Sequence, residues 1–175
     1  RVIALVVDGA PVAAVETGPD LEVGPEVEIV TNQTPFYAES GGQLGDTGWL
    51  LGEAVEATVT DTTKRLGELW VHHARLEKGR LQVGDTVHLQ VDAERRGRLR
   101  RAHSATHLLH AALRQRLGDH VAQKGSLVAP DRLRFDFSQP KAMTADDIRT
   151  VEREVNDYVQ QNGPVEVRVM AREAA

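Results

Sequence analysis

Cysteine is absent from the 175 residues of this chain, and aromatic residues make up only 4% of them. Without cysteine there is neither a disulfide framework nor a thiolate metal ligand, so a metal site would have to use histidine, aspartate or glutamate. The lack of disulfides fits a reducing compartment, and we expect the protein to be cytoplasmic. No apolar run approaches the roughly 20 residues of a membrane-spanning helix, so we expect no membrane partner.

An initiator methionine and a signal peptide are also missing, because residues 1–7 read RVIALVV, which is typical of a strand. We therefore interpret the chain as a piece of a longer protein. Its length is enough for one large domain or two small ones with a buried core. The contents of 41% hydrophobic and 27% charged residues are those of an ordinary globular protein.

Positive charge is scarce overall but concentrated locally. The formal net charge is −5, which argues against a surface that wraps nucleic acid along its whole length. Between residues 95 and 101, however, five positions are arginine: Arg95, Arg96, Arg98, Arg100 and Arg101. Such a cluster is either a solvated helix face or a patch that contacts phosphates, and the pattern alone does not choose between them.

The sequence pattern changes near residue 92. Before it, short segments of period two alternate with turn dipeptides such as Gly24-Pro25 and Gly84-Asp85. The strands we expect there are Val2–Val7, Val27–Val30, Ala54–Asp61, Glu68–His73 and Thr86–Val91. Short strands at this spacing predict a small antiparallel β-barrel over residues 1–91.

Residues 92–175 favour a second unit with helices packed on an antiparallel sheet. A helix over 93–117 begins after Asp92 as N-cap and stops at Gly118, with apolar residues recurring every three or four positions. Strands over 121–128 and 132–137 follow, and then a helix capped by Thr144 that ends at residues 163–164. The fold class is therefore α+β. A last strand over 165–170 would leave a bare sheet edge, and a dimer through that edge is a plausible consequence.

Two histidines are the first candidates for chemistry. His103 and His107 stand four residues apart on the expected helix, so both rings project from one face about 6 Å apart. Two histidines at this spacing can share one zinc ion, although the pair alone is a weak signal. Ser104 follows the first histidine where a thermolysin-type protease needs glutamate, which disfavours a metalloprotease. We interpret His110 as a residue that packs in the core or supports a metal ligand, and His72 with His73 as a less favoured source of ligands.

Two further segments are unusual. Residues 34–46 read TPFYAESGGQLGD, and their glycines permit a positive φ or a close backbone approach by a ligand. The segment lacks the Gly-Lys-Ser/Thr ending of a phosphate-binding loop, so it is either a tight loop that closes the barrel or a ligand loop. The polar run 123–126 interrupts an apolar strand, and its side chains either face solvent or line a pocket.

Together these segments resemble the alanyl-tRNA synthetases and their free-standing editing relatives. TPFYAESGGQLG, residues 34–45, is similar to the glycine-rich signature of that family. HSATHLLHAALRQRL, residues 103–117, resembles its first zinc-ligand motif, and residues 121–128 and 133–138 continue the match. The order and spacing agree, and the resemblance covers nearly the whole chain.

The resemblance implies the editing region of the family, which cleaves the ester joining serine or glycine to the 3′ end of tRNA(Ala). It implies that His103 and His107 are zinc ligands and that Gln123 and Thr106 are catalytic residues of the editing pocket. The substrate contacts that we expect with it are Gly41, Gly42, Gln43, Lys124 and Ser126, and the tRNA contacts are Arg95, Arg98 and Arg101.

The family's second zinc motif, a Cys-x-x-x-His, does not occur in this sequence. Two imidazoles are fewer than the three protein ligands of a typical catalytic zinc. We therefore predict that this chain binds Zn²⁺ poorly and hydrolyses little, although the complete domain would bind Zn²⁺ and edit. Two alternatives stay open: a free-standing deacylase that acts in trans, and a non-catalytic tRNA-binding module that uses residues 95–101 and in which the histidines are structural.

Overall fold

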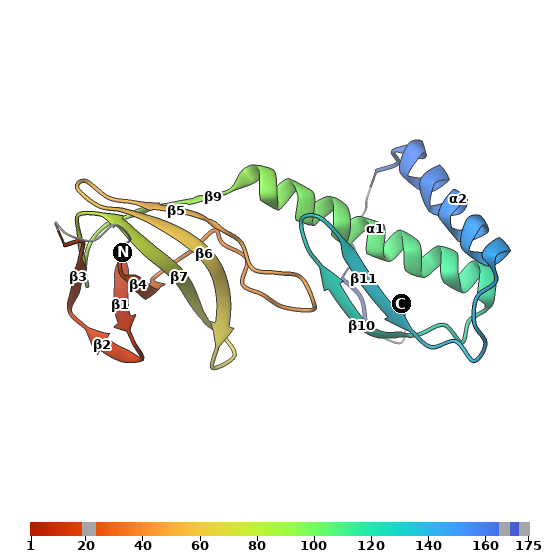
Figure 1. Ribbon diagram of the computed structural model, residues 1–175, viewed down its shortest axis with the longest axis horizontal. Helices are drawn as coiled ribbons and strands as arrows, with labels where there is room; N and C mark the ends of the chain where they lie inside the picture. Colours follow the sequence, from red (N-terminus) through yellow and green to blue (C-terminus); the bar gives the residue numbers. More distant parts are fainter. Residues whose placement is uncertain (19–23, 165–168, 172–175) are drawn as a thin grey trace.

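A computed structural model describes residues 1–18, 24–164 and 169–171. Figure 1 shows a large sheet at one end, from which a long helix runs to a two-stranded hairpin and a second helix. In chain order the elements are β1 (Val2–Val7), β2 (Ala10–Val12), β3 (Ala14–Glu16), β4 (Glu26–Thr31), β5 (Gly48–Leu51), β6 (Glu56–Arg65), β7 (Leu69–Lys78), β8 (Arg80–Gln82), β9 (His88–Val91), α1 (Ala93–Leu117), β10 (Gln123–Val128), β11 (Leu133–Phe137) and α2 (Ala145–Gln161). The predicted α+β class is confirmed.

The large sheet is antiparallel and open. Its seven strands follow the order β2-β1-β4-β7-β6-β5-β9, so β2 and β9 are its edges, while β3 and β8 pair separately with each other. The predicted barrel therefore does not close by strand pairing within the described residues. Val2 of β1 is hydrogen-bonded to the connection between β8 and β9: its N–H donates to the Asp85 carbonyl at 2.9 Å, and its carbonyl accepts from the Gly84 N–H at 2.9 Å. The strands β3 and β8, which form a pair of their own, were not among the strands predicted from the sequence.

The core of this sheet follows from alternation along its strands. In β6, Ala57 and Val59 are buried, whereas the residues between and beside them are more exposed. In β1 the buried residues Val2 and Leu5 are three apart, because the register with β4 shifts between Val2 and Ala4. Such an extra residue moves the following side chains to the opposite face. Strict period two at this strand therefore gives the wrong inward set.

The second cluster packs α1 against α2 and the β10–β11 hairpin (Figure 1). Its buried centre consists of Ala112, Leu113, Val121 and Val151. The capping signals predicted from the sequence are confirmed: Asp92 accepts from the Arg95 N–H, and Gly118 ends α1 at a φ of 115°. Among the residues that the structure describes, neither helix is long and apolar enough to cross a membrane.

The end of α2 comes slightly earlier than predicted. The helix ends at Gln161, and Asn162 adopts a left-handed conformation, with a φ of 46°, as its C-cap. The predicted last strand falls mostly on residues 165–168, which lie outside the described residues, and the described Val169 and Met170 are not in a strand. The change of pattern near residue 92 lies between β9 and α1, and the division into two domains there stays a prediction.

Removal of the α2 cap should destabilise the helix end. The Thr144 hydroxyl accepts from the Asp147 N–H at 3.1 Å, and the Asp147 carboxylate accepts from the Thr144 N–H at 3.0 Å. We expect Thr144→Ala to lower the free energy of unfolding by about 1 kcal/mol in chemical denaturation. Ser104→Ala, an exposed position on α1, is the control and should change it by less than about 0.5 kcal/mol. Equal effects of the two substitutions would contradict the capping role.

Candidate functional site

The glycine-rich segment forms the connection between β4 and β5, and it extends from the sheet toward α1 and the hairpin (Figure 1). At its tip, Ser40 and Gln43 exchange two backbone hydrogen bonds of 3.2 and 3.0 Å. The two residues between them, Gly41 and Gly42, have φ values of 59° and 82°. A tight turn with a positive φ at both central positions strongly favours glycine, which explains the Gly-Gly pair.

A buried histidine anchors the start of this loop. His72, in β7, is fully buried, and its Nδ1 lies 2.9 Å from the Ile29 carbonyl. A carbonyl only accepts, so Nδ1 carries the proton, and Nε2 accepts from the Thr34 hydroxyl at 2.7 Å. The Phe36 N–H donates to the same hydroxyl at 3.1 Å. Both nitrogens of His72 are therefore engaged inside the sheet, and the less favoured interpretation of His72 as a metal ligand is wrong.

A buried carboxylate anchors the end of the loop. Asp46 is 1% exposed and forms a bidentate ion pair with Arg96, whose Nε donates to Oδ1 at 2.7 Å. The same carboxylate accepts from the Tyr37 N–H at 2.6 Å, and the Thr62 hydroxyl donates to the Asp46 carbonyl at 2.9 Å. The hydrogen bond to Asp46 raises the pKa of Arg96 above its ordinary value. One arginine of the cluster, for which a solvated helix face and a phosphate patch were both open, thus holds the loop.

The tip of the loop docks on the second part of the chain. The Gly42 carbonyl accepts from the Val128 N–H at 2.7 Å, and the Leu44 N–H donates to the Val128 carbonyl at 3.1 Å. A Cβ atom at Gly42 would lie 2.3 Å from the Ser126 carbonyl oxygen, so only glycine permits this approach. Glycine is therefore required here by a close contact within the chain, which the sequence did not distinguish from contact with a ligand.

The two predicted zinc ligands lie beside the docked loop. The rings of His103 and His107 stack with their centroids 5.1 Å apart and their planes at 22°, and both side chains are exposed. The residue Gln43 is only 8% exposed, and its amide oxygen lies 2.7 Å from His103 Nδ1. The structure therefore brings four predicted site residues to one place: Gly42, Gln43, His103 and Ser126.

The other predicted pocket residues are placed less centrally. The hydroxyl of the buried Thr106 donates to the Ala102 carbonyl at 2.9 Å, within its own helix. Gln123 and Lys124 are exposed at the end of β10 that is far from Val128. Since His110 Nε2 lies 3.5 Å from the Val121 carbonyl, β10 runs along α1 in the opposite direction. Gln123 is thus nearer to the later turns of α1 than to the docked loop.

Histidine nitrogen is a donor that zinc prefers, and the two rings share one helix face. They fit part of a zinc site. Within residues 1–18, 24–164 and 169–171, no group of three or more histidine, cysteine, aspartate or glutamate side chains is arranged to hold a metal ion. The described residues therefore provide two donors, and further ligands would have to come from elsewhere.

The arginines divide into two kinds. Arg95 Nη1 donates to the Gly45 carbonyl at 2.7 Å, so it supports the loop together with Arg96. Arg98 is exposed and pairs with Glu94 one turn away, and Arg100 and Arg101 are exposed. The exposed three keep guanidinium groups at the surface, whereas the first two are used inside the chain.

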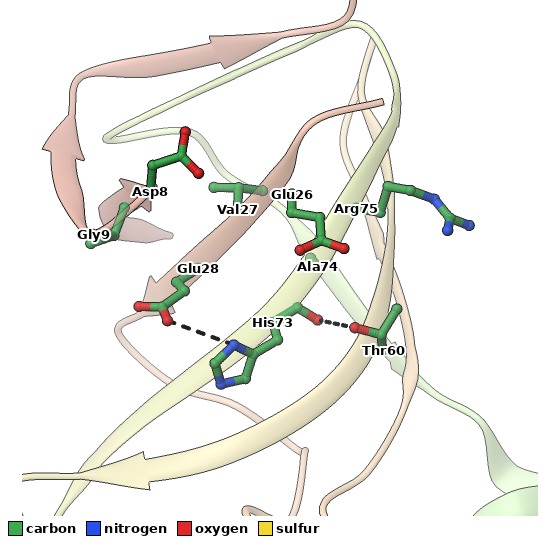
Figure 2. A pocket seen from close by; sticks show the side chains of 10 residues that line it. Asp8, Gly9, Glu26, Val27, Glu28, Thr60, His73, Ala74 and Arg75 are labelled. Atoms are coloured by element: carbon green, nitrogen blue, oxygen red, sulfur yellow. Dashed lines mark hydrogen bonds and ion pairs between the residues drawn. The ribbon is translucent and has the colours of Figure 1, made fainter. Parts of the chain in front are cut away.

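A separate hollow of about 280 Å³ lies on the large sheet and is lined by residues of β1, β4, β6 and β7 (Figure 2). None of the predicted site residues lines it. Its Glu28 carboxylate already pairs with Arg65 at 2.6 Å and lies 3.7 Å from His73 Nδ1. His73 Nε2 is also engaged, 2.8 Å from the Thr63 hydroxyl. This hollow is therefore a weaker candidate than the docked loop.

The chain belongs to the family of class II (A) tRNA synthetases, whose sequence pattern matches residues 2–95. Its relatives include proteins named alanine–tRNA ligase. The one from Sphingopyxis alaskensis is 58% identical over 175 residues, which are 99% of this chain and 19% of that protein. The ligases of Granulibacter bethesdensis and Paracoccus denitrificans are each 55% identical, over all of this chain and 19% of their own length. The chain thus spans 19% of the length of these relatives.

The close approach at Gly42 gives a matched pair of substitutions. Gly41 and Gly42 both have a positive φ, but a Cβ at Gly41 would have nothing within 4 Å. We expect Gly41→Ala to cost about 1 kcal/mol of stability, and Gly42→Ala also to undock the loop. Hydrogen exchange at the Leu44 and Val128 amides measures docking. Equal protection of these amides in the two variants would show that the contact with Ser126 does not hold the loop.

The buried His72 should make stability depend on pH. Burial lowers the pKa of His72 from its ordinary value, against a hydrogen bond to Ile29 that raises it. Below about pH 6.5 the unfolded chain binds a proton that the folded ring resists, so the free energy of unfolding falls as the pH decreases. We expect His72→Asn to flatten this dependence between pH 7.5 and 5, measured by denaturant unfolding. The exposed His120→Asn is the control, and an unchanged slope in His72→Asn would refute the assignment.

Proposed function

We propose that this chain is the editing region of an alanine–tRNA ligase, and that the complete protein uses it to hydrolyse serine or glycine from tRNA(Ala). One observation carries the proposal. Three segments far apart in the sequence meet at one place, where Gly42 and Gln43 of the loop contact Ser126 of β10 and His103 of α1. These are the segments whose sequences resemble the editing region.

The chemistry explains why such a ligase needs a second site. A synthetic pocket shaped for alanine cannot strongly exclude serine, which adds only a hydroxyl, so discrimination there stays near 10²-fold. A site that hydrogen-bonds that hydroxyl rejects alanine much better, by about 10⁴ to 10⁵, because alanine leaves its polar groups unpaired. Polar side chains such as Gln123 and Thr106 have the chemistry that a site of this kind requires.

Different residues of the chain would bind the metal ion and the substrate. His103 and His107 would hold a zinc ion together with ligands from outside the described residues. When bound, zinc supplies a Lewis acid that polarises the ester carbonyl or activates water. Gln123 and Thr106 would hydrogen-bond the aminoacyl group, and the exposed ammonium group of Lys124 suits the phosphate of the terminal nucleotide. With two donors of its own, the isolated chain would bind Zn²⁺ weakly and turn over little.

Contacts with the rest of the tRNA would come from the exposed arginines. Arg98 and Arg101 lie one turn apart on α1, and exposed guanidinium groups are suited to phosphate oxygens. Arg95 already donates to the Gly45 carbonyl, so its part in tRNA binding would be secondary to its support of the loop. Action on tRNA during protein synthesis also implies a cytoplasmic protein.

The exposed arginines favour a second candidate, a tRNA-binding module without turnover. It requires only the surface of α1, and the two histidines would then be structural. Both candidates predict tRNA binding that weakens with salt. Both also predict that binding persists without hydrolysis after His103 and His107 are replaced by alanine in the complete protein. Hydrolysis by the parent protein separates the editing function from this candidate.

Deacylation of seryl-tRNA(Ala) by the complete ligase tests the proposal. We expect Gln123→His to lower the single-turnover rate about 100-fold, the scale of losing one hydrogen-bond donor to the reacting group. Gln161→His, at an exposed position of α2, is the matched control and should leave the rate within twofold. A rate for Gln123→His within twofold of the parent would remove Gln123 from the pocket, and no hydrolysis by the parent would refute the function.

A further inference from the structure

Gln43 occupies an unusual position for a polar side chain. It is only 8% exposed, yet its amide oxygen lies 2.7 Å from Nδ1 of the exposed His103, sixty residues away in the chain. Its backbone is fixed from two directions, by the turn with Ser40 and by a bridge to Val128. The loop therefore holds the amide oxygen of Gln43 next to Nδ1 of His103.

That contact determines where the imidazole proton lies. An amide oxygen only accepts hydrogen bonds, so His103 Nδ1 must donate. A neutral imidazole has one N–H, so the lone pair of His103 is then on Nε2. Metal-binding histidines are typically held in this way, because a partner on the second nitrogen fixes both the proton and the ring orientation.

We propose that Gln43 is a positioning residue, which fixes the tautomer and the ring orientation of His103 so that Nε2 is presented beside His107 for metal coordination. This differs from the substrate contact predicted for Gln43 from the sequence. Only the use of the presented nitrogen for zinc rests on the proposed function, because the tautomer follows from the hydrogen bond itself. The loop thus acts on the site through His103.

A second histidine–glutamine pair in the chain provides a matched control, in which the glutamine contacts the other ring nitrogen. His120 also pairs with a glutamine, but through its other nitrogen, with Nε2 lying 2.6 Å from the Gln139 amide oxygen. By the same argument His120 carries its proton on Nε2. The contact between the two side chains is exposed and lies away from the loop, so a substitution there tests whether removal of any glutamine partner alters His103.

The tautomers can be measured without metal or substrate. We expect two-bond ¹H–¹⁵N correlation spectra at about pH 8 to show His103 protonated on Nδ1. Gln43→Met keeps the side-chain length but removes the acceptor, so His103 should lose this preference, whereas Gln43→Glu keeps an oxygen in place and should restore it. Gln139→Met should alter His120 alone. If Gln43→Met fails to fold, the parent and Gln43→Glu spectra still test the assignment.

Zinc affinity is the second readout. We expect Gln43→Met to weaken the binding of Zn²⁺ alone by about tenfold or more, in competition with a chromophoric chelator, while Gln139→Met leaves it unchanged. An Nε2-protonated His103 in the parent, or a Gln43→Met variant with unaltered tautomer and zinc affinity, would overturn the positioning role even if seryl-tRNA(Ala) is hydrolysed. A shifted tautomer without hydrolysis in the complete ligase would instead count against the proposed function alone.

Discussion

The buried ion pair between Asp46 and Arg96 is the constraint on which the rest of this structure depends. The carboxylate is almost fully buried, so its cost of desolvation is offset only by the guanidinium and by the Tyr37 N–H. Removal of the guanidinium would leave the carboxylate uncompensated inside the protein. Because Asp46 ends the glycine-rich loop and Arg96 lies in the first turns of α1, this pair joins the large sheet to the helix that carries the histidines.

Everything at the candidate site follows from where the loop is held. His72 and Thr34 hold its start, Asp46 holds its end, and the length between them brings the turn at Gly41 and Gly42 onto β10. The turn then places the Gln43 amide against His103. If side-chain contacts held only one end of the loop, the rest of it would retain its conformational entropy. The Gln43 side chain would then not be held at one particular nitrogen of His103. The sheet therefore serves the site mainly as a support for this loop.

Much of the fold could be predicted from local signals. The bounds of α1 and the strand over residues 2–7 were predicted correctly, because an N-cap, a terminating glycine and hydrophobic periodicity are properties of neighbouring residues. The strands β2, β3, β5 and β8 were missed, since three or four residues are too few to show a period. The prediction of a closed barrel was wrong, because closure depends on which strand edges pair. The paired strands β3 and β8, for example, lie far apart in the sequence.

The site shows the same division. The sequence by itself determined which residues are unusual: the two histidines on one helix face, the glycine pair and the arginine cluster. Only the tertiary structure decided their partners, since Arg96 turned inward to Asp46 while Arg98 stayed at the surface, and nothing in the spacing separates the two. A pattern along the chain reports the conformation of the neighbouring backbone. The contacts of Gln43 with His103 and of Gly42 with Ser126 join residues 60 and 84 positions apart, so they depend on how the folded elements pack.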